Sequence, residues 1–374
     1  MNEPFLNLGN QPLANNFLSR LDEKEYFYIL EIGFDKETNL VSLINIPDSS
    51  LAFNENYAYV SSTSETMKNH FADCAKQIEK LFKPSSVLEI GSNDGIFIKN
   101  FNTNIAECVE PCKNFAQITT NIGYITYNNM FNENLPSNKQ YDIIYAANSI
   151  PHIPNLDEVF KGIVKFLKDN GMFIMECPSL LSIINNYSYD QWYNEHPHTF
   201  SLLSLSKILK KYGLYIWKCE ELPVHGGSYR VYINKIKSGN IDKIILKEKI
   251  AKLDDFTTYT DFAKNIHIIK EKTIELVNKF DKVVAYGATA KSTTVLNYCQ
   301  IKTKYIIDST LSKQNKYSPG MHIPIVPRVD GLYEADAILL TAWNYFDEIT
   351  KKEQDYLNKG GKFIVLPNPY IYGK

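Results

Sequence analysis

Short apolar runs alternate with amphipathic stretches along most of the chain, and this alternation predicts an α/β protein. In the central part, the strands are expected at Ser86–Ile90, Ala106–Val109, Tyr124–Thr126, Tyr141–Ala147 and Met172–Glu176, and the helices near 94–101, 112–121 and 155–168. Strands that alternate with helices indicate a parallel, doubly wound sheet. Two further runs, Leu214–Cys219 and Tyr229–Ile233, predict antiparallel strands that close this sheet.

The flanking segments have patterns of their own. Glu25–Ile32 and Val41–Ile44 predict a β-hairpin, which a helical stretch from 64 to 82 follows. Residues 240–280 are lysine-rich and helical, and a second α/β series begins at Asp281. Its strands are expected at Lys282–Tyr286, Tyr305–Ile307, Ala337–Thr341 and Phe363–Leu366, with helices near 291–299 and 347–358. We therefore expect a small N-terminal α+β domain (1–63), a central doubly wound domain (64–236), a helical connector (237–280) and a C-terminal Rossmann-like domain (281–374).

Charge and cysteine content exclude several classes of function. The chain has 40 basic and 42 acidic residues and a net charge of −2. It therefore lacks the excess of positive charge that is typical of nucleic-acid-binding proteins. No apolar run approaches the roughly 20 residues of a membrane span. The N-terminus does not have the basic segment followed by an apolar segment that is typical of a secretion signal. None of the six cysteines forms a C-x-x-C pair, which argues against a zinc ribbon or a disulfide framework. We expect a reduced, cytoplasmic enzyme.

The segment Leu88–Gly95 has the composition of a cofactor-binding turn between a strand and a helix. Gly91 lets the backbone approach a ligand closely, and the glycines are spaced G-x-x-x-G rather than G-x-G-x-x-G. This spacing suits an amino-acid carboxylate better than a pyrophosphate. Glu110 ends the next strand, where an acid can bind ribose hydroxyls. The pattern predicts S-adenosylmethionine (SAM) as cofactor, bound by Glu89, Gly91, Asn93, Gly95, Glu110 and Asn148.

Four polar segments carry side chains suited to proton transfer. They are Tyr57–Ser62, Asn148–His152, Tyr193–His198 and His225–Arg230. His152 and Glu195-His196 follow predicted strands, and ligands of open α/β sheets bind beyond the carboxyl ends of the strands. Histidine is the usual general base near neutral pH, although each of these histidines also has a purely structural interpretation. Gly226-Gly227-Ser228 can wrap a phosphate or simply form a hairpin turn. Metal ligation is not favoured, and we predict no bound metal.

Taken together, these segments resemble the SAM-dependent nucleotide-sugar C-methyltransferases that make branched deoxysugars. The resemblance extends over nearly the whole chain. Its N-terminal and central pieces are Leu8–Asn15, Tyr57–Ser62, Leu88–Gly95, Asn148–His152, Tyr193–His196 and His225–Arg230. Its C-terminal pieces are Tyr286–Lys291, Pro319–Pro324 and Trp343-Asn344.

The resemblance implies three domains and methylation at C3 of a nucleotide-linked 4-keto sugar. It places the catalytic set at Tyr59, His152, Tyr193, Glu195 and His196, with His196 as the base that generates an enediolate. We also expect substrate contacts from His225, Ser228, Arg230 and Lys291, although Lys291 could equally be a surface residue. A monomer or weak dimer is expected.

One departure concerns zinc. The family's N-terminal domain usually binds zinc through two cysteine pairs, and here Gly33–Thr38 takes the place of the second pair. We therefore predict no structural zinc. Two other functions stay open: O-methylation of a sugar or sugar nucleotide, and oxidation or epimerisation with NAD on the C-terminal unit. Asp308 is placed for a ribose contact there, but the turn at Gly287 lacks the second and third glycines of a dinucleotide site. A non-catalytic binding protein fits least well.

Overall fold

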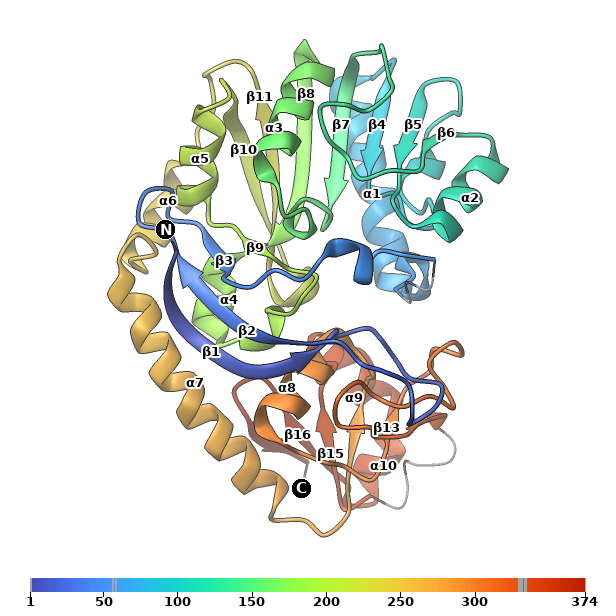
Figure 1. Ribbon diagram of the computed structural model, residues 1–374, viewed down its shortest axis with the longest axis vertical. Helices are drawn as coiled ribbons and strands as arrows, with labels where there is room; N and C mark the ends of the chain where they lie inside the picture. The colour runs from blue at the N-terminus through green and yellow to red at the C-terminus, as the bar shows by residue number, and fades with distance from the viewer. Residues whose placement is uncertain (1, 56, 58, 329–331, 333–334, 374) are drawn as a thin grey trace.

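The computed structural model describes residues 2–55, 57, 59–328, 332 and 335–373 (Figure 1). Its central sheet has seven strands in the order β10-β11-β8-β7-β4-β5-β6. They are β4 (Val87–Ile90), β5 (Ala106–Val109), β6 (Ile125–Tyr127), β7 (Tyr141–Ala147), β8 (Leu167–Pro178), β10 (Tyr215–Leu222) and β11 (Ser228–Asn234). Only β11 runs against the common direction of these strands. The predicted doubly wound sheet is confirmed.

Helices cover both faces of this sheet because its strands are apolar on both sides. The helix before the first of these strands is α1 (Glu65–Phe82), and those between the strands are α2 (Lys113–Ile122), α3 (Leu156–Phe166), α4 (Leu180–Asn186) and α5 (Leu202–Lys210). Leu88 and Ile144 share one buried cluster with residues of α3 and α5, whereas Val87 and Ile143 share another with residues of α1. Successive residues of a strand thus face opposite layers of helices, because the side chains of a strand alternate between its two faces.

The helix expected near 94–101 is absent. The structure has only the short 3₁₀ helix η3 (Ile98–Asn100) there. Asn93 and Gly95 both have positive φ, 47° and 75°, and this left-handed backbone conformation is incompatible with an α-helix beginning there. The buried Glu89 carboxylate accepts a hydrogen bond from the Ile98 backbone N–H at 3.1 Å and holds this turn in place.

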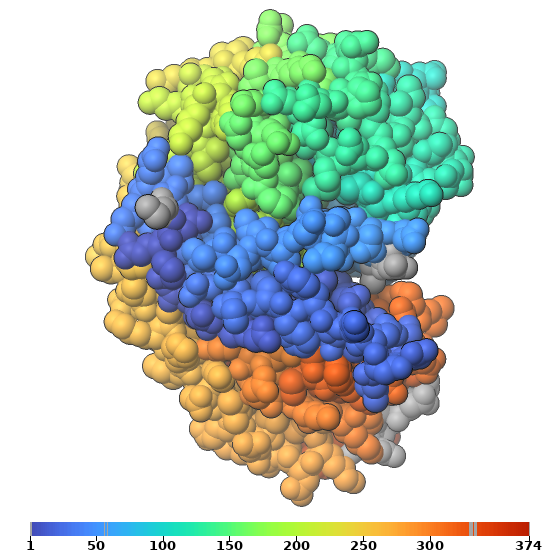
Figure 2. Space-filling model, viewed as in Figure 1, coloured from blue at the N-terminus to red at the C-terminus, as the bar shows by residue number. Residues whose placement is uncertain are grey.

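The N-terminal sheet has the order β1-β2-β3-β9 and is not built from the first residues alone. Its strands are β1 (Glu3–Pro12), β2 (Phe27–Phe34), β3 (Val41–Leu43) and β9 (His198–Thr199). β9 comes from the segment after the candidate catalytic residues and pairs antiparallel with β3. The long β1 and β2 lie between the central and C-terminal parts (Figure 1), and the N-terminal residues form a belt across the surface there (Figure 2).

Hydrogen bonds close the hairpin at the place where the resembled family has its second cysteine pair. The Asp35 carboxylate accepts from the Thr38 hydroxyl at 2.6 Å and from the Glu37 N–H at 3.1 Å. Below the hairpin, Phe34 stacks on Tyr259 with ring centroids 4.6 Å apart. Among the described residues, no group of three or more His, Cys, Asp or Glu side chains is arranged to hold a metal ion. The absence of zinc stays a prediction, which metal analysis of the purified protein can test.

The C-terminal sheet has six strands in the order β14-β13-β12-β15-β16-β17. They are β12 (Val283–Tyr286), β13 (Ile306–Ile307), β14 (Ile325–Val326), β15 (Ala337–Leu340), β16 (Lys362–Val365) and the antiparallel edge strand β17 (Tyr370–Tyr372). Its helices and those of the connector are α6 (Asp242–Ile250), α7 (Phe256–Val277), α8 (Ala290–Cys299), α9 (Phe346–Lys352) and α10 (Gln354–Asn358). The N-terminal sheet, α7 and α8 share one hydrophobic core. In the described part of the chain, no helix is both long and apolar enough to cross a bilayer.

The helix expected at 347–358 is broken into α9 and α10 at Glu353. This residue is fully buried, and its carboxylate accepts hydrogen bonds from the Arg328 guanidinium at 2.7 and 2.6 Å and from the Tyr286 hydroxyl at 2.8 Å. An unpaired buried carboxylate is costly. Glu353 therefore departs from the helical conformation so that its buried carboxylate pairs with Arg328.

Candidate active site

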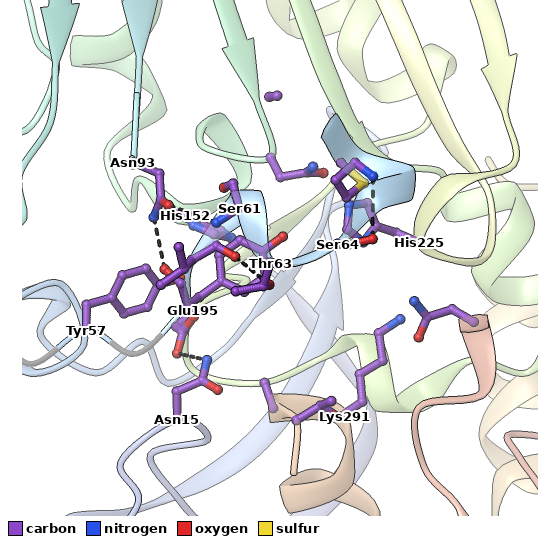
Figure 3. A pocket seen from close by; sticks show the side chains of 18 of the residues that line it. Asn15, Tyr57, Ser61, Thr63, Ser64, Asn93, His152, Glu195, His225 and Lys291 are labelled. Atoms are coloured by element: carbon purple, nitrogen blue, oxygen red, sulfur yellow. Dashed lines mark hydrogen bonds between the residues drawn. The ribbon is translucent and has the colours of Figure 1, made fainter. Parts of the chain in front are cut away.

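A cavity of about 410 Å³ lies where the central sheet, the N-terminal segment and the C-terminal sheet meet. It opens beyond the carboxyl ends of β4, β5 and β7, where open α/β sheets bind ligands. One wall is formed by the described residues between 53 and 64, called the strap below, which include the 3₁₀ helix η2 (Ser61–Thr63). Figure 3 shows side chains from all three parts of the molecule facing this space.

The turn after β4 forms one end of the cavity. Gly91 has φ of 74°, and a Cβ there would come within 2.6 Å of the Ser149 Cβ. Glu110 lines the cavity, and its carboxylate accepts from the Asn93 N–H at 2.7 Å and the Cys112 N–H at 2.8 Å. Asn148 also lines it, with a buried Oδ1 that has no partner among the described residues. An acid at the ribose position, an unsatisfied acceptor and a close backbone approach fit an amino-acid-bearing nucleoside such as SAM.

Two of the predicted cofactor residues lie behind this turn instead of in the cavity wall. Glu89 is buried, and burial raises the pKa of its carboxyl group well above the ordinary value. A Cβ at Gly95 would lie 3.0 Å from the Thr119 Cγ2 atom, so this glycine permits close packing against α2. Both residues shape the turn from behind, and neither lines the cavity.

Asn93 connects the cofactor turn to the strap. Its Nδ2 group donates to the Tyr59 carbonyl oxygen at 3.0 Å, and its Oδ1 atom accepts from the Ser61 N–H at 3.0 Å. Tyr59 is 40% exposed and lies at the edge of the cavity. The side chain of Asn93 therefore holds the strap beside the cofactor turn.

The histidine pair lies at the centre of the site. The His196 Nδ1 atom is 2.7 Å from the Gln191 carbonyl oxygen, which can only accept, so Nδ1 carries the proton. Nε2 then accepts from the Tyr193 hydroxyl at 2.8 Å. His152 stacks on His196 with ring centroids 5.0 Å apart, and its buried Nε2 has no partner among the described residues. Burial, and then the nearby His152, lower the pKa of His196 well below its usual value, so the ring stays neutral at pH 7.

Glu195 points away from His196, towards the N-terminal segment. In the described part of the chain, its carboxylate accepts from Asn15 Nδ2 at 2.8 Å and from the Tyr57 hydroxyl at 3.1 Å (Figure 3). Burial raises the pKa of Glu195 to about 7, although both hydrogen bonds oppose this shift. The site therefore contains two separate proton-transfer groups, a neutral imidazole and a carboxyl group that titrates near neutrality.

A cation lies at the other side of the cavity. Lys291 is the second residue of α8, whose N-terminal cap is Thr289, and its Nζ atom is 4.6 Å from the centroid of the Trp343 ring. This Nζ is buried without a hydrogen-bond partner among the described residues, and burial lowers the pKa of Lys291 to about 8. His225 lines the same side of the cavity, and burial lowers its pKa to about 4.

Ser228 and Arg230, the other two predicted substrate residues, lie outside the cavity wall. The Ser228 hydroxyl donates to the Val224 carbonyl oxygen at 3.0 Å, within a turn through the 3₁₀ helix η6 (Val224–Gly226) that joins β10 to β11. The Gly226-Gly227-Ser228 segment is therefore a hairpin turn. Arg230 is 3% exposed, and its Nε atom donates to Glu176 Oε1 at 2.6 Å. The charge of Arg230 is therefore paired inside the sheet, away from the cavity wall, and its predicted contact with the substrate stays a prediction.

Comparison with known proteins matches the central and C-terminal parts of the chain to two families of domain. Residues 65–218 match the methyltransferase domain family, and residues 223–367 match the C-methyltransferase C-terminal domain family. The chain is a SAM-dependent methyltransferase. The methyltransferase is 28% identical over 393 residues to the C-methyltransferase NovU of Streptomyces niveus, a match that covers 98% of this chain and 93% of NovU.

Two further similarities cover less than half of the chain. The methyltransferase is 25% identical over 155 residues to a ubiquinone biosynthesis O-methyltransferase of Rickettsia bellii, covering 37% of this chain and 59% of that protein. A solved SAM-dependent methyltransferase of Clostridium acetobutylicum matches 48% of this chain and 94% of its own at 15% identity, with a TM-score of 0.38.

Sequence reasoning gave no individual role to several residues that the structure brings to this site. Asn15 is part of the Leu8–Asn15 motif and Tyr57 of the strap, and both bond Glu195. Asp190 is fully buried and accepts from the Trp343 indole N–H at 2.6 Å, beside Lys291. The local sequence does not identify these residues as part of the site, because each contacts a partner that is distant in the sequence.

A Gly91→Ala variant of the methyltransferase is expected to bind SAM about tenfold or more weakly, because its Cβ would displace Ser149. Isothermal titration calorimetry measures this loss. Gly213→Ala is the matched control: Gly213 has φ of 69°, but a Cβ there would meet no neighbouring side chain or backbone within 4 Å, so this variant reports the backbone strain alone. Equal SAM affinity in both variants would argue against a role of the close contact between Gly91 and Ser149 in shaping the cofactor site.

Proposed function

We propose that this methyltransferase transfers a methyl group to C3 of a nucleotide-linked 4-keto sugar. The observation that carries the proposal is the neutral His196, whose unprotonated Nε2 accepts from the Tyr193 hydroxyl in the same cavity as the cofactor turn. Methylation of carbon needs a base that removes a proton from a carbon acid, and a neutral imidazole meets this need. The match to a C-methyltransferase C-terminal domain and the similarity to NovU also support carbon as the acceptor.

The proposed chemistry begins with proton removal. The C4 carbonyl acidifies the C3 hydrogen, and His196 Nε2 accepts that proton, so that C3 becomes nucleophilic as an enediolate forms on the sugar. The Tyr193 hydroxyl bonds Nε2 in the free site and can turn to the developing oxyanion as the proton arrives. The His152 Nε2 atom, which has no partner among the described residues, is a second group able to bond that oxygen.

The cofactor supplies the electrophilic methyl group. Glu110, Asn148 and the backbone at Gly91 are the groups that would hold it, by the fit described above. The strap would keep water away from the reacting atoms, and Asn93 fastens it at this end. Excluding water protects an enediolate from simple reprotonation.

The opposite side of the cavity is suited to an anion. Lys291 lies there near the start of α8, whose N-terminal backbone N–H groups favour negative charge, and His225 of η6 lines the same side. A nucleotide diphosphate on the sugar would place its charge at this end. We therefore assign Lys291, and not Arg230, to the substrate's phosphates.

Mass spectrometry of 4-keto sugar nucleotides incubated with the enzyme and SAM tests the proposal, and one added methyl group is expected. Incubation in deuterated water without SAM should exchange the C3 hydrogen if the base enolises the sugar. Methylation without prior exchange, or methylation of sugars that lack a keto group, would instead support transfer to a hydroxyl oxygen. No methylation of any sugar nucleotide in the panel would overturn the proposal.

A further inference from the structure

Asn15 lies at a point where the three parts of the molecule meet. It follows β1 in the N-terminal segment, lines the cavity and donates from Nδ2 to Glu195 Oε1 at 2.8 Å. Glu195 itself comes from the central domain and is 3% exposed. Figure 3 shows the Asn15 side chain reaching the carboxylate from below, on the side facing the C-terminal domain.

The backbone next to Asn15 is fixed on both sides. The Ala14 N–H donates to Asn194 Oδ1 at 2.8 Å, so the residue before Glu195 holds the residue before Asn15. The Ala14 carbonyl oxygen accepts from the Thr293 hydroxyl of α8 at 2.8 Å. Both bonds are buried, and together they set the position of the Asn15 amide before any substrate arrives. Such preorganisation is what a precisely placed polar group in an active site requires.

The hydrogen bond has a fixed direction. An amide Nδ2 group can only donate, and a donor to a carboxylate favours the charged form. We propose that Asn15 is a positioning residue, whose amide orients the Glu195 carboxylate in the cavity for bonding a substrate hydroxyl. This inference rests on the proposed function for the identity of the substrate, but the contact itself does not depend on it.

The surroundings of Glu195 make it sensitive to the loss of one donor. Burial raises its pKa to about 7, and the bonds from Asn15 and Tyr57 together with the charge of Lys313 lower it. The other titratable groups that interact with this carboxylate are Tyr28, Cys112 and Tyr193, with His196 next in the chain. Burial raises the pKa of each of these three, so they are neutral near pH 7 and Lys313 is the cation that faces the carboxylate.

The sign of the expected effect follows from this balance. The ionised carboxylate is present above its pKa, so activity that needs it is lost as the pH falls through about 7. Without Asn15 the charged form loses a donor, and the acidic limb of the pH profile moves to higher pH. The loss at pH 6.5 should be about tenfold, the order expected for one hydrogen bond to a charged group, with activity approaching that of the wild type at pH 9.

The experiment uses the full chain and compares Asn15→Ala and the isosteric Asn15→Asp with Asn16→Ala. It measures kcat/KM against pH with the sugar nucleotide that the wild-type enzyme methylates. Asn16 is the neighbouring asparagine and is exposed. We expect the acidic limb to move upwards in both Asn15 variants and not in Asn16→Ala. An unmoved limb in correctly folded Asn15→Ala and Asn15→Asp, or a loss that is equal at every pH, would overturn the proposal.

A measurement without substrate separates this inference from the proposed function. Difference infrared spectroscopy of the free protein, with Glu195→Gln to identify the band, follows protonation of the Glu195 carboxyl group directly. Its midpoint should rise in Asn15→Ala even if no 4-keto sugar is methylated. A midpoint equal to that of the wild type would refute the role of Asn15 whatever the substrate is.

Discussion

A His196→Asn variant is expected to retain SAM binding and to lose turnover by about 10²–10⁴-fold, the usual contribution of a general base. Asparagine can still donate to the Gln191 carbonyl oxygen in place of Nδ1, but it presents no basic nitrogen to the substrate. The burial that lowers the pKa of His196 keeps the imidazole neutral, so the wild-type base is available throughout the neutral range. Single-turnover kinetics at saturating SAM measure the loss in the chemical step.

Two further variants give this prediction its controls. His267→Asn changes a histidine of α7 that bonds the Tyr298 hydroxyl and does not line the cavity, so turnover should be unchanged. Tyr193→Phe removes the hydroxyl bonded to Nε2 but leaves the base, so its loss should be smaller than that of His196→Asn. Exchange of the C3 hydrogen at the wild-type rate in His196→Asn would exclude this histidine as the base.

Arg230→Met is expected to destabilise the fold by about 3–5 kcal/mol, the cost of leaving a buried partner charge unpaired. The partner is Glu176, at the end of β8, which also accepts from His70 Nε2 at 2.6 Å and the Tyr145 hydroxyl at 3.0 Å. Chemical denaturation monitored by circular dichroism measures this loss of unfolding free energy. A substrate-binding arginine would behave differently, because its removal would raise KM while leaving stability nearly unchanged.

The pH dependence of the same variant has a defined sign. Burial raises the pKa of Glu176, but His70 and Arg230 outweigh it, and the net pKa lies below the ordinary value. The wild-type pair therefore stabilises the fold above the ordinary glutamate pKa, and that contribution disappears as the pH falls through the lowered value. The difference in stability between Arg230→Met and the wild type should accordingly shrink in acid.

A surface pair and a double variant complete this test. Arg20→Ala removes the ion pair between Arg20 and Asp22, whose side chains are 73% and 70% exposed, and should leave stability nearly unchanged. Arg230→Met combined with Glu176→Gln removes both buried charges and should recover part of the loss. A stable Arg230→Met single variant would make Arg230 a candidate substrate contact again.

The central domain could be predicted closely because its signals are local. Apolar runs, turn glycines and the acid at the end of β5 lie within one continuous stretch, so the sheet, the Gly91 turn and the place of Glu110 followed from neighbouring residues. The prediction of continuous helices failed at two places where the hydrogen bonds of a buried glutamate determine the backbone conformation. Glu89 bonds the Ile98 N–H where a helix was expected, and Glu353 breaks the expected helix at 347–358.

The sequence by itself determined the class of fold, the cofactor turn and the residue types needed for proton transfer, because these depend on local pattern and on chemistry that each side chain carries. Only the tertiary structure decided which of those side chains share a cavity. It placed Arg230 against Glu176 within the sheet, brought Lys291 to the cavity from the C-terminal domain, and joined Asn15 to Glu195. The partners in these contacts lie far apart in the chain, and their burial and pairing depend on the packing of three separate sheets.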